Sequence, residues 1–275
     1  MLLPGESRFG RYVIRRLLAE GRSATLYEAR HTHPNLRDRR TVLKVLRNRH
    51  NTEYFLHQAR AHAALRHPRV PAVYEVAEED GRPYLARAFV EEAAPRLVIG
   101  QEPWPVPAVL RVVADVAEVL DFAHRCGFGH GDLHPRHLLF GEDGAMWVIG
   151  FGEYPSAGDA AFGNPHLLAP EQLAGAPVTP ATDVYALGGV AVWMLCGRAP
   201  FAHLSGQELF DAKRTGPTPR SVRAERPDVP AAMAEVLDRA LAIDPAARYP
   251  GPGTFAAELA AAEHVAPRRR WWLWQ

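Results

Sequence analysis

The spacing of apolar residues changes near residue 90, and this change limits the possible folds of the chain more than any other feature. Before it, short β-branched and aromatic segments alternate with turns, which predicts strands. One segment without helix breakers, residues 53–65, predicts a helix among them. From Val106 onward, apolar residues recur at helical spacing. We therefore expect an α+β protein with a small β-rich lobe and a larger helical lobe, joined near residues 89–94.

The same patterns place the individual elements. The predicted strands are residues 12–18, 25–29, 41–46, 72–76 and 84–90. The predicted helices are 53–65, one that begins at 106, 182–196, 231–242 and 254–263.

Composition excludes several classes of protein. With 32 basic and 31 acidic residues the net charge is only +1, so no nucleic-acid partner is predicted. Cys126 and Cys196 form no pattern typical of a disulfide framework or a metal site, and a cytoplasmic location is therefore predicted. We expect both cysteines to be buried as small hydrophobic side chains.

The C-terminus combines cations with indoles. The residues are Arg268, Arg269, Arg270, Trp271, Trp272 and Trp274. This composition is typical of a membrane interface, and equally of a frayed tail or an aromatic plug for a surface groove. Membrane association through these residues is thus one of two open alternatives.

One ten-residue segment carries the clearest motif. Residues 130–139 are H-G-D-L-H-P-R-H-L-L. They resemble the catalytic loop of Hanks-type protein kinases, H-R-D-x-K-P-x-N-x-L, and the bacterial serine/threonine kinases most of all. The opening H-G-D-L-H-P also resembles the loop of aminoglycoside-phosphotransferase-type kinases.

Companion motifs follow in the family's order. They are the phosphate-loop position 19–24, the strand lysine in 42–44, H-P at 67–68, A-P-E-Q at 169–172, D-V-Y-A-L-G at 183–188 and D-P-A-A-R at 244–248. The resemblance covers roughly residues 9–263 and implies a bilobal kinase-like fold. Its parts would be an N-terminal tail 1–8, an N-lobe 9–90, a C-lobe 91–263 and a C-terminal tail 264–275.

The resemblance also implies catalytic and nucleotide-binding positions. Asp132 is the remnant of the catalytic base, and Lys44 is the strand lysine. The implied cofactor-binding residues are Ala19, Gly21, Ala24, Val42, Lys44, Arg87, Phe89 and Leu139. Only Gly21 remains of the three loop glycines, and Arg87 would place a long cation beside the adenine pocket. ATP binding is therefore expected to be weak or absent.

The family's metal positions have lost their usual ligands. Gly150, in G-F-G, replaces the aspartate, and His137 replaces the asparagine of the catalytic loop. Glycine offers no ligand, and imidazole suits softer metals better than Mg²⁺. Mg²⁺ is therefore not expected. Because the family packs His130 inward, at most two histidines of this loop could converge, and no metal site is predicted.

Other charged parts are altered as well. Gln58 stands where the family has the glutamate that pairs with the strand lysine. His134 replaces the catalytic-loop lysine and would be a weak substitute if protonated. Gly131 replaces the arginine that receives an activating phosphate, and Ser156 is the one serine or threonine of the short segment between Gly152 and Ala169.

Scaffold residues of the family remain. The resemblance implies a buried ion pair between Glu171 and Arg248, and it implies that Asp183 accepts hydrogen bonds from the catalytic-loop backbone. We also expect Asp132 to serve mainly as a buried acceptor for loop amides.

These losses in a retained scaffold predict a pseudokinase, a regulatory module that binds a protein such as an active kinase or its substrate. The first alternative is an active or residually active serine/threonine kinase, with Lys44 and Asp132 and with Glu153, His134 or His137 rewired to hold a metal. The second alternative is a small-molecule phosphotransferase.

Overall fold

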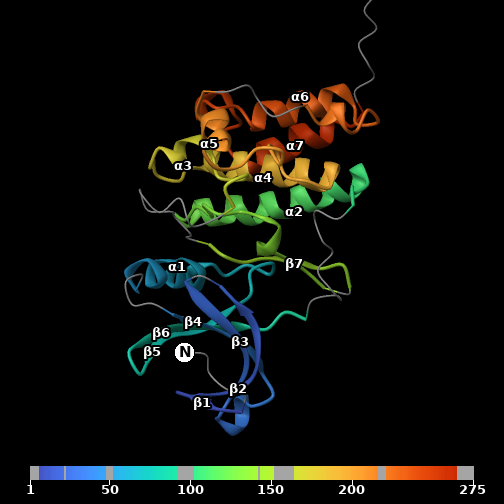
Figure 1. The fold of residues 1–275 in the computed structure, drawn as a ribbon. Helices are drawn as coiled ribbons and strands as arrows, with labels where there is room; N and C mark the ends of the chain where they lie inside the picture. Colours follow the sequence, from blue (N-terminus) through green and yellow to red (C-terminus); the bar gives the residue numbers. More distant parts are fainter. Residues whose placement is uncertain are drawn as a thin grey trace, which may run out of the picture. The chain divides into compact units, whose positions relative to one another are not determined.

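The structure is a computed structural model. It describes residues 6–21, 23–47, 52–91, 102–141, 143–151, 164–215 and 221–264. The chain divides into two compact units (Figure 1), and each is described by itself. The first holds residues 1–96 with later segments that include a short hairpin, and the second holds most of the remaining chain.

The N-terminal unit is built on a six-stranded antiparallel sheet with strand order β1-β2-β3-β4-β6-β5. Its strands are β1 (Arg8–Phe9), β2 (Tyr12–Glu20), β3 (Ala24–His31), β4 (Arg40–Leu46), β5 (Val73–Glu79) and β6 (Arg82–Ala88). Successive side chains of a strand point to opposite faces of the sheet. The residues that point to one face, among them Tyr27 of β3, Leu43 of β4 and Ala86 of β6, form one hydrophobic core.

The helix of this unit, α1 (Thr52–Ala64), contacts β5 and β6. Phe55 and Ala59 pack with Leu46 and Leu85 in a second core cluster. The unit also contains the hairpin β7 (Leu138–Phe140) and β8 (Met146–Val148), which a 3-10 turn at Pro135–His137 precedes.

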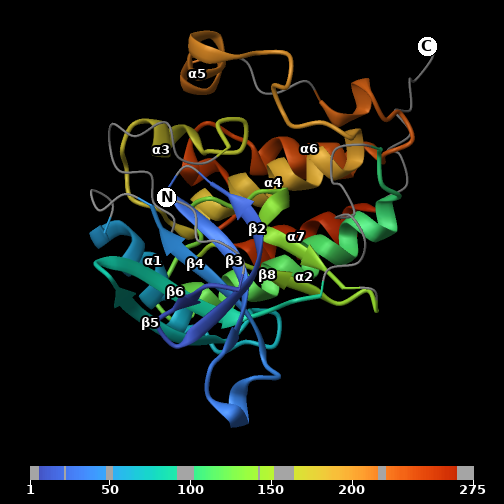
Figure 2. The ribbon, with the colours of Figure 1, turned by 60° about the horizontal axis from the view of Figure 1, so that its bottom comes forward.

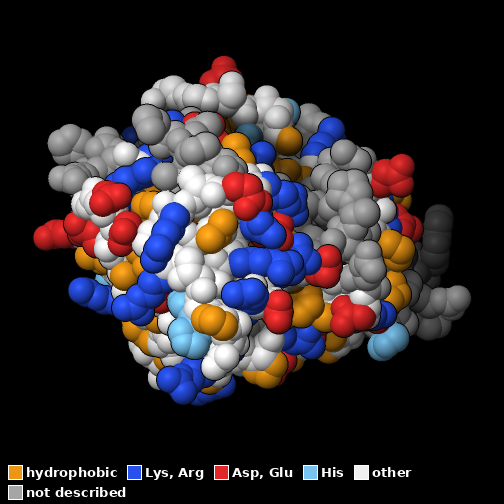
Figure 3. All heavy atoms as spheres, turned by 90° about the horizontal axis from the view of Figure 1, so that it is seen from below, with side chains coloured by type: hydrophobic (Ala, Val, Ile, Leu, Met, Phe, Trp, Pro, Cys, Tyr) orange, Lys and Arg blue, Asp and Glu red, His pale blue; other side chains and the backbone are white. Residues whose placement is uncertain are grey.

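Arginines of the N-terminal unit lie among carboxylates. Arg16 and Arg40 both bind Glu28, at 2.8 and 2.9 Å, and Arg47 binds Glu20 at 2.7 Å. Figure 3 shows basic and acidic side chains interspersed on the face seen from below Figure 1. Mixed charges of this kind are typical of a solvated surface.

The C-terminal unit is helical and surrounds α4 (Pro180–Cys196), which contacts α2 (Val106–Arg125), α6 (Ala231–Ala240) and α7 (Pro252–Ala262). Figures 1 and 2 show these helices side by side. Thr179 caps α4 at its start, and Gly197 ends it in the left-handed conformation at φ 72°. Since α4 is apolar on every side, it is buried as the centre of the unit. Two further helices are α3 (Pro170–Leu173) and α5 (Gly206–Thr215).

The structure confirms the predicted α+β kinase-like fold class and finds each predicted strand and helix within a few residues of its expected ends. Helices α3 and α5 and strand β1 were not predicted. The expectation for the cysteines is wrong for Cys126, which is exposed just beyond α2, while Cys196 is half-buried. No described helix has the length and apolar character needed to cross a bilayer. The arginine–tryptophan tail lies outside the described residues.

Candidate active site

Asp183 fixes the backbone at the start of the catalytic-loop motif. Its carboxylate is fully buried and accepts the amides of His130 and Gly131, each at 2.9 Å. His124, near the end of α2, lies 2.7 Å from the same carboxylate. Burial raises the pKa of Asp183, but the His124 hydrogen bond, the charges of His124 and His130 and the Gly131 amide lower it by more. The expected scaffold role of Asp183 is thus found.

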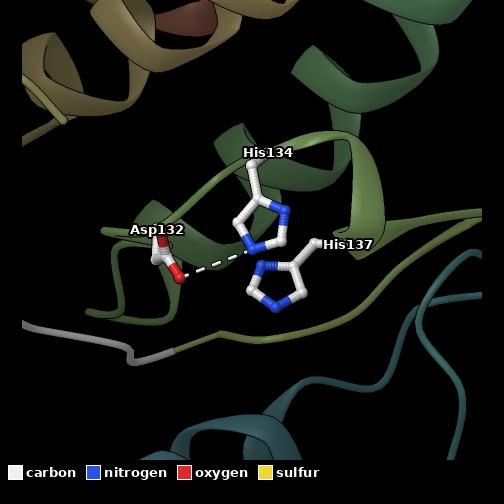
Figure 4. Close-up of side chains that lie close together, drawn as sticks. All are labelled: Asp132, His134 and His137. Atoms are coloured by element: carbon white, nitrogen blue, oxygen red, sulfur yellow. Dashed lines mark ion pairs between the residues drawn. The ribbon is translucent and has the colours of Figure 1, made fainter. Parts of the chain in front are cut away.

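Asp132 follows directly and is 8% exposed. One carboxylate oxygen accepts the amide of Asn164 at 3.4 Å, and the other lies 3.6 Å from Nε2 of His134 (Figure 4). The carboxylate is therefore held in place in the manner expected of a buried acceptor. Through the amide of Asn164, the segment that begins at residue 164 contacts this carboxylate, which is the group that could act as a base.

A backbone hydrogen bond determines which ring nitrogen carries the proton in neutral His134. Nδ1 accepts the amide of Arg136 at 3.1 Å, so this nitrogen carries no proton while the bond exists. The proton of the neutral ring is then on Nε2, which faces Asp132.

His137 fills the space beside Gly150. A Cβ atom built on Gly150 would lie 2.6–2.8 Å from ring atoms of His137, and Gly150 has a φ of +90°. The amide of Ile149 donates to the carbonyl of His137 at 3.0 Å, which fixes the two backbones together. An aspartate at position 150 would require this ring to move. The residues present therefore do not fit the family's Mg²⁺ site, and Glu153 lies outside the described residues.

Three possible metal ligands do gather on the loop. Ligand atoms of Asp132, His134 and His137 all lie within 4.8 Å of one another, and Figure 4 shows the two rings next to the carboxylate. His130 is fully buried and is not among them. The expectation that at most two of the three loop histidines converge is met. The sequence argument did not foresee that Asp132 would complete the group.

In the N-terminal unit, Lys44 donates to Oε1 of Gln58 at 3.3 Å. The predicted ion–dipole contact thus replaces the family's ion pair, and the lysine keeps its neighbour on α1. The turn that follows β2 closes through the amide of Gly21 and the carbonyl of Ala24, at 2.9 Å.

The remaining nucleotide positions are mostly buried. Val42 and Leu139 are 3% and 6% exposed. The guanidinium of Arg87, expected to extend beside an adenine pocket, donates to the carbonyl of the next residue, Ala88, at 3.0 Å, and the residue is 7% exposed. Phe89 lies under the guanidinium of Arg40, 3.9 Å from the ring centre. Ala19 lies on β2 and is half-buried.

Segment 164–172 is anchored from several sides. Arg248 and Glu171 form the expected pair through two bonds of 2.7 Å, and the Arg248 side chain is completely buried. Gln172 donates to the carbonyl of Gly131 at 2.6 Å and accepts the amide of Ala169 at 2.9 Å. Lys213 of α5 donates to the carbonyls of His166 and Leu168 at 2.9 and 2.5 Å. The contacts of Gln172 and Lys213 were missed in the sequence.

Four features together define a protein-kinase fold. They are a sheet-based unit with a lysine–α1 contact, a helical unit, a loop fixed by a buried aspartate, and a buried arginine–glutamate pair. The family model described as "Protein kinase domain" matches residues 12–261. The chain therefore belongs to the protein kinase domain family.

Named relatives agree with this assignment. Serine/threonine-protein kinase PknJ of Mycobacterium tuberculosis is 31% identical over 94% of the chain and 46% of the relative. The DNA damage-responsive serine/threonine-protein kinase RqkA of Deinococcus radiodurans is 32% identical over 86% of the chain and 37% of the relative. The chain thus spans less than half the length of these curated relatives. A crystal structure of the Mycobacterium tuberculosis PknI kinase domain, a double mutant, has a TM-score of 0.78 at 28% identity and covers 96% of this chain and 100% of that one.

Proposed function

We propose that this chain is a serine/threonine protein kinase domain that transfers phosphate slowly, with Asp132 as the base and without the family's Mg²⁺ arrangement. The observation that carries the proposal is the placement of Asp132, buried and oriented on a loop that Asp183 fixes. Kinase catalysis depends mostly on positioning and charge stabilisation, and the positioning parts are retained. The two relatives named above, PknJ and RqkA, are serine/threonine-protein kinases, which supports the same class.

A slow rate follows from the missing charges. Gln58 gives Lys44 a neutral partner, and His134 stands where the family has a permanently charged lysine. Electrostatic stabilisation is usually the largest catalytic term, so its loss lowers the rate more than the retained positioning can restore. The substrate class would be a protein hydroxyl, because the Glu171–Arg248 anchor of the segment after Asn164 belongs to the protein-kinase type of fold rather than to small-molecule phosphotransferases.

A pseudokinase that binds a protein partner is the second candidate. The observation that favours it is Gly150, which supplies no ligand and whose side-chain space the His137 ring fills. In that case the retained scaffold would serve recognition alone. The free thiols of Cys126 and Cys196 support a cytoplasmic location for either candidate.

Phosphoryl transfer separates the two candidates. The purified chain would be incubated with labelled ATP, a generic protein substrate and Mg²⁺, Mn²⁺ or Zn²⁺ in turn. We expect slow transfer to serine or threonine that falls by at least about a hundredfold in Asp132→Asn, since a positioned base contributes about 10²–10⁴ in rate.

The matched control is Asp143→Asn, an exposed aspartate on the β7–β8 turn whose carboxylate accepts the amide of Ala145. Asparagine supports the same turn, so this variant should transfer phosphate at the wild-type rate. No transfer with any metal, or equal transfer by Asp132→Asn, would overturn the kinase proposal and leave the pseudokinase first.

A further inference from the structure

Asp183 binds the backbone amides of residues 130 and 131, and the loop that follows brings three possible metal ligands together. Asp132 supplies a carboxylate oxygen, and His134 and His137 supply ring nitrogens. The Asp132–His134 separation is 3.6 Å. Two ligands bound to one tetrahedral Zn²⁺ at about 2.0–2.1 Å are separated by about 3.3 Å. A movement of a few tenths of an ångström therefore suffices for this pair to share a cation.

The donor set selects a class of metal. Two imidazoles and one carboxylate suit Zn²⁺, Co²⁺ or another late first-row divalent ion, whereas Mg²⁺ prefers oxygen ligands and retains its waters. Three protein ligands leave further coordination positions open, as in catalytic rather than structural zinc sites. Asp132 is buried while both histidines are half-buried, so the carboxylate is pre-placed and the rings remain accessible to an incoming ion.

Gly150 contributes to the site by having no side chain. The ring of His137 lies where a side chain at position 150 would be, at 2.6–2.8 Å from an added Cβ. Glycine at position 150, where the family has an aspartate ligand, leaves room for the ring of His137. The ring can therefore lie near Asp132 and His134. This linkage is a reason to regard His137 as a ligand in place of the missing aspartate.

We propose that Asp132, His134 and His137 bind one divalent transition-metal ion of the Zn²⁺ type, in place of the family's Mg²⁺ ions. The proposal deepens the proposed kinase function by naming its metal. Oδ2 of Asp132, the oxygen that faces His134, would bind the ion, which leaves Oδ1 to act as the base. Binding of the ion does not require catalysis. Binding through Nε2 of His134 moves the ring proton to Nδ1, so the Arg136 amide must release this nitrogen. That exchange replaces the Arg136 hydrogen bond with a metal–nitrogen bond, and it provides a signature of its own.

The test is a titration of the purified chain with Co²⁺ and Zn²⁺, without nucleotide, by calorimetry and by the visible d–d absorption of Co²⁺. We expect one ion per chain at this loop, unaffected by Mg²⁺ in excess. His134→Ala and His137→Ala should each weaken binding by at least about tenfold, since each removes one of three protein ligands. The matched control is His203→Ala, an exposed histidine remote in sequence from the loop, which should bind as the wild type does.

A second readout does not depend on the variants folding. In ¹⁵N-histidine-labelled wild-type protein, Co²⁺-free Zn²⁺ titration should shift the protonated nitrogen of His134 from Nε2 to Nδ1. Binding that persists in both alanine variants, an unchanged His134 tautomer on Zn²⁺ binding, or displacement by Mg²⁺ would overturn the site. Ion binding without phosphoryl transfer would uphold the site while removing the kinase proposal, and transfer without ion binding at these residues would do the reverse.

Discussion

Glu171→Gln is expected to lower the free energy of unfolding by about 3–5 kcal/mol, the cost of leaving one partner of a buried ion pair without the other. The Arg248 side chain is fully buried, and Glu171 takes two of its hydrogen bonds at 2.7 Å. The carbonyls of Ala181, Ala242 and Ile243 take others, at 2.8–3.0 Å. These carbonyls hold the guanidinium in place but do not neutralise it. Glutamine keeps the size of glutamate, removes the charge and replaces one of the two acceptor oxygens with an NH2 group.

The matched control for this prediction is Glu225→Gln. Glu225 binds Arg198 at 2.6 Å, but the arginine side chain is 59% exposed, and exposed pairs contribute about 0–1 kcal/mol. Urea denaturation of the two variants beside the wild type makes the comparison. A loss below about 1 kcal/mol in Glu171→Gln would mean that the carbonyls alone stabilise Arg248 and that the pair is not essential to the unit.

Sequence reasoning succeeded where chemistry is local or is carried by a motif. The Asp183 contacts and the Glu171–Arg248 pair were predicted from the residues present at motif positions. The neutral contact between Lys44 and Gln58 followed in the same way, because the resemblance places Gln58 where the family has the glutamate that pairs with the strand lysine. Helix α4 was predicted because apolar residues recur at helical spacing in this half of the chain.

The metal-ligand cluster was missed because it depends on shape. Sequence shows that position 150 is glycine, but not that the ring of His137 occupies the vacated space. Nor does it show that Asp132 faces His134 rather than loop amides alone. Residue identity gave the candidates, and only the backbone path between residues 132 and 150 decides which of them converge.

Cys126 and α5 were missed for different physical reasons. Cys126 lies just after the end of α2, where the chain turns and its side chain no longer points to the helical core. Helix α5 has a polar composition and few buried residues, Leu209 and Lys213, so its apolar spacing is weak. Its role depends on Lys213, whose carbonyl partners are more than forty residues away in sequence.

Lys213 is one of only two lysines in a chain with 32 basic residues. Because it is buried, we expect the free energy of unfolding to depend on pH above neutrality. Burial lowers its pKa from 10.5 to about 7, with Glu171 opposing this shift and Arg248 adding to it. The other neighbours are His166, whose carbonyl it binds, and the rings of Tyr185 and Phe201. No carboxylate of the described residues forms an ion pair with it, since Glu171 is engaged by Arg248.

The direction of the effect follows from proton binding. Between about pH 7 and 10.5 the unfolded chain holds a proton on Lys213 that the folded chain has released, so the free energy of unfolding rises with pH. From pH 7 to pH 9 the gain over Lys213→Met should be about 2 kcal/mol, measured by urea denaturation. Lys213→Arg is the matched control, because arginine keeps its proton throughout this range and should show no such gain. If all three proteins have parallel pH profiles, the ammonium of Lys213 stays charged in the fold, and its two carbonyl bonds are strong enough to offset its burial.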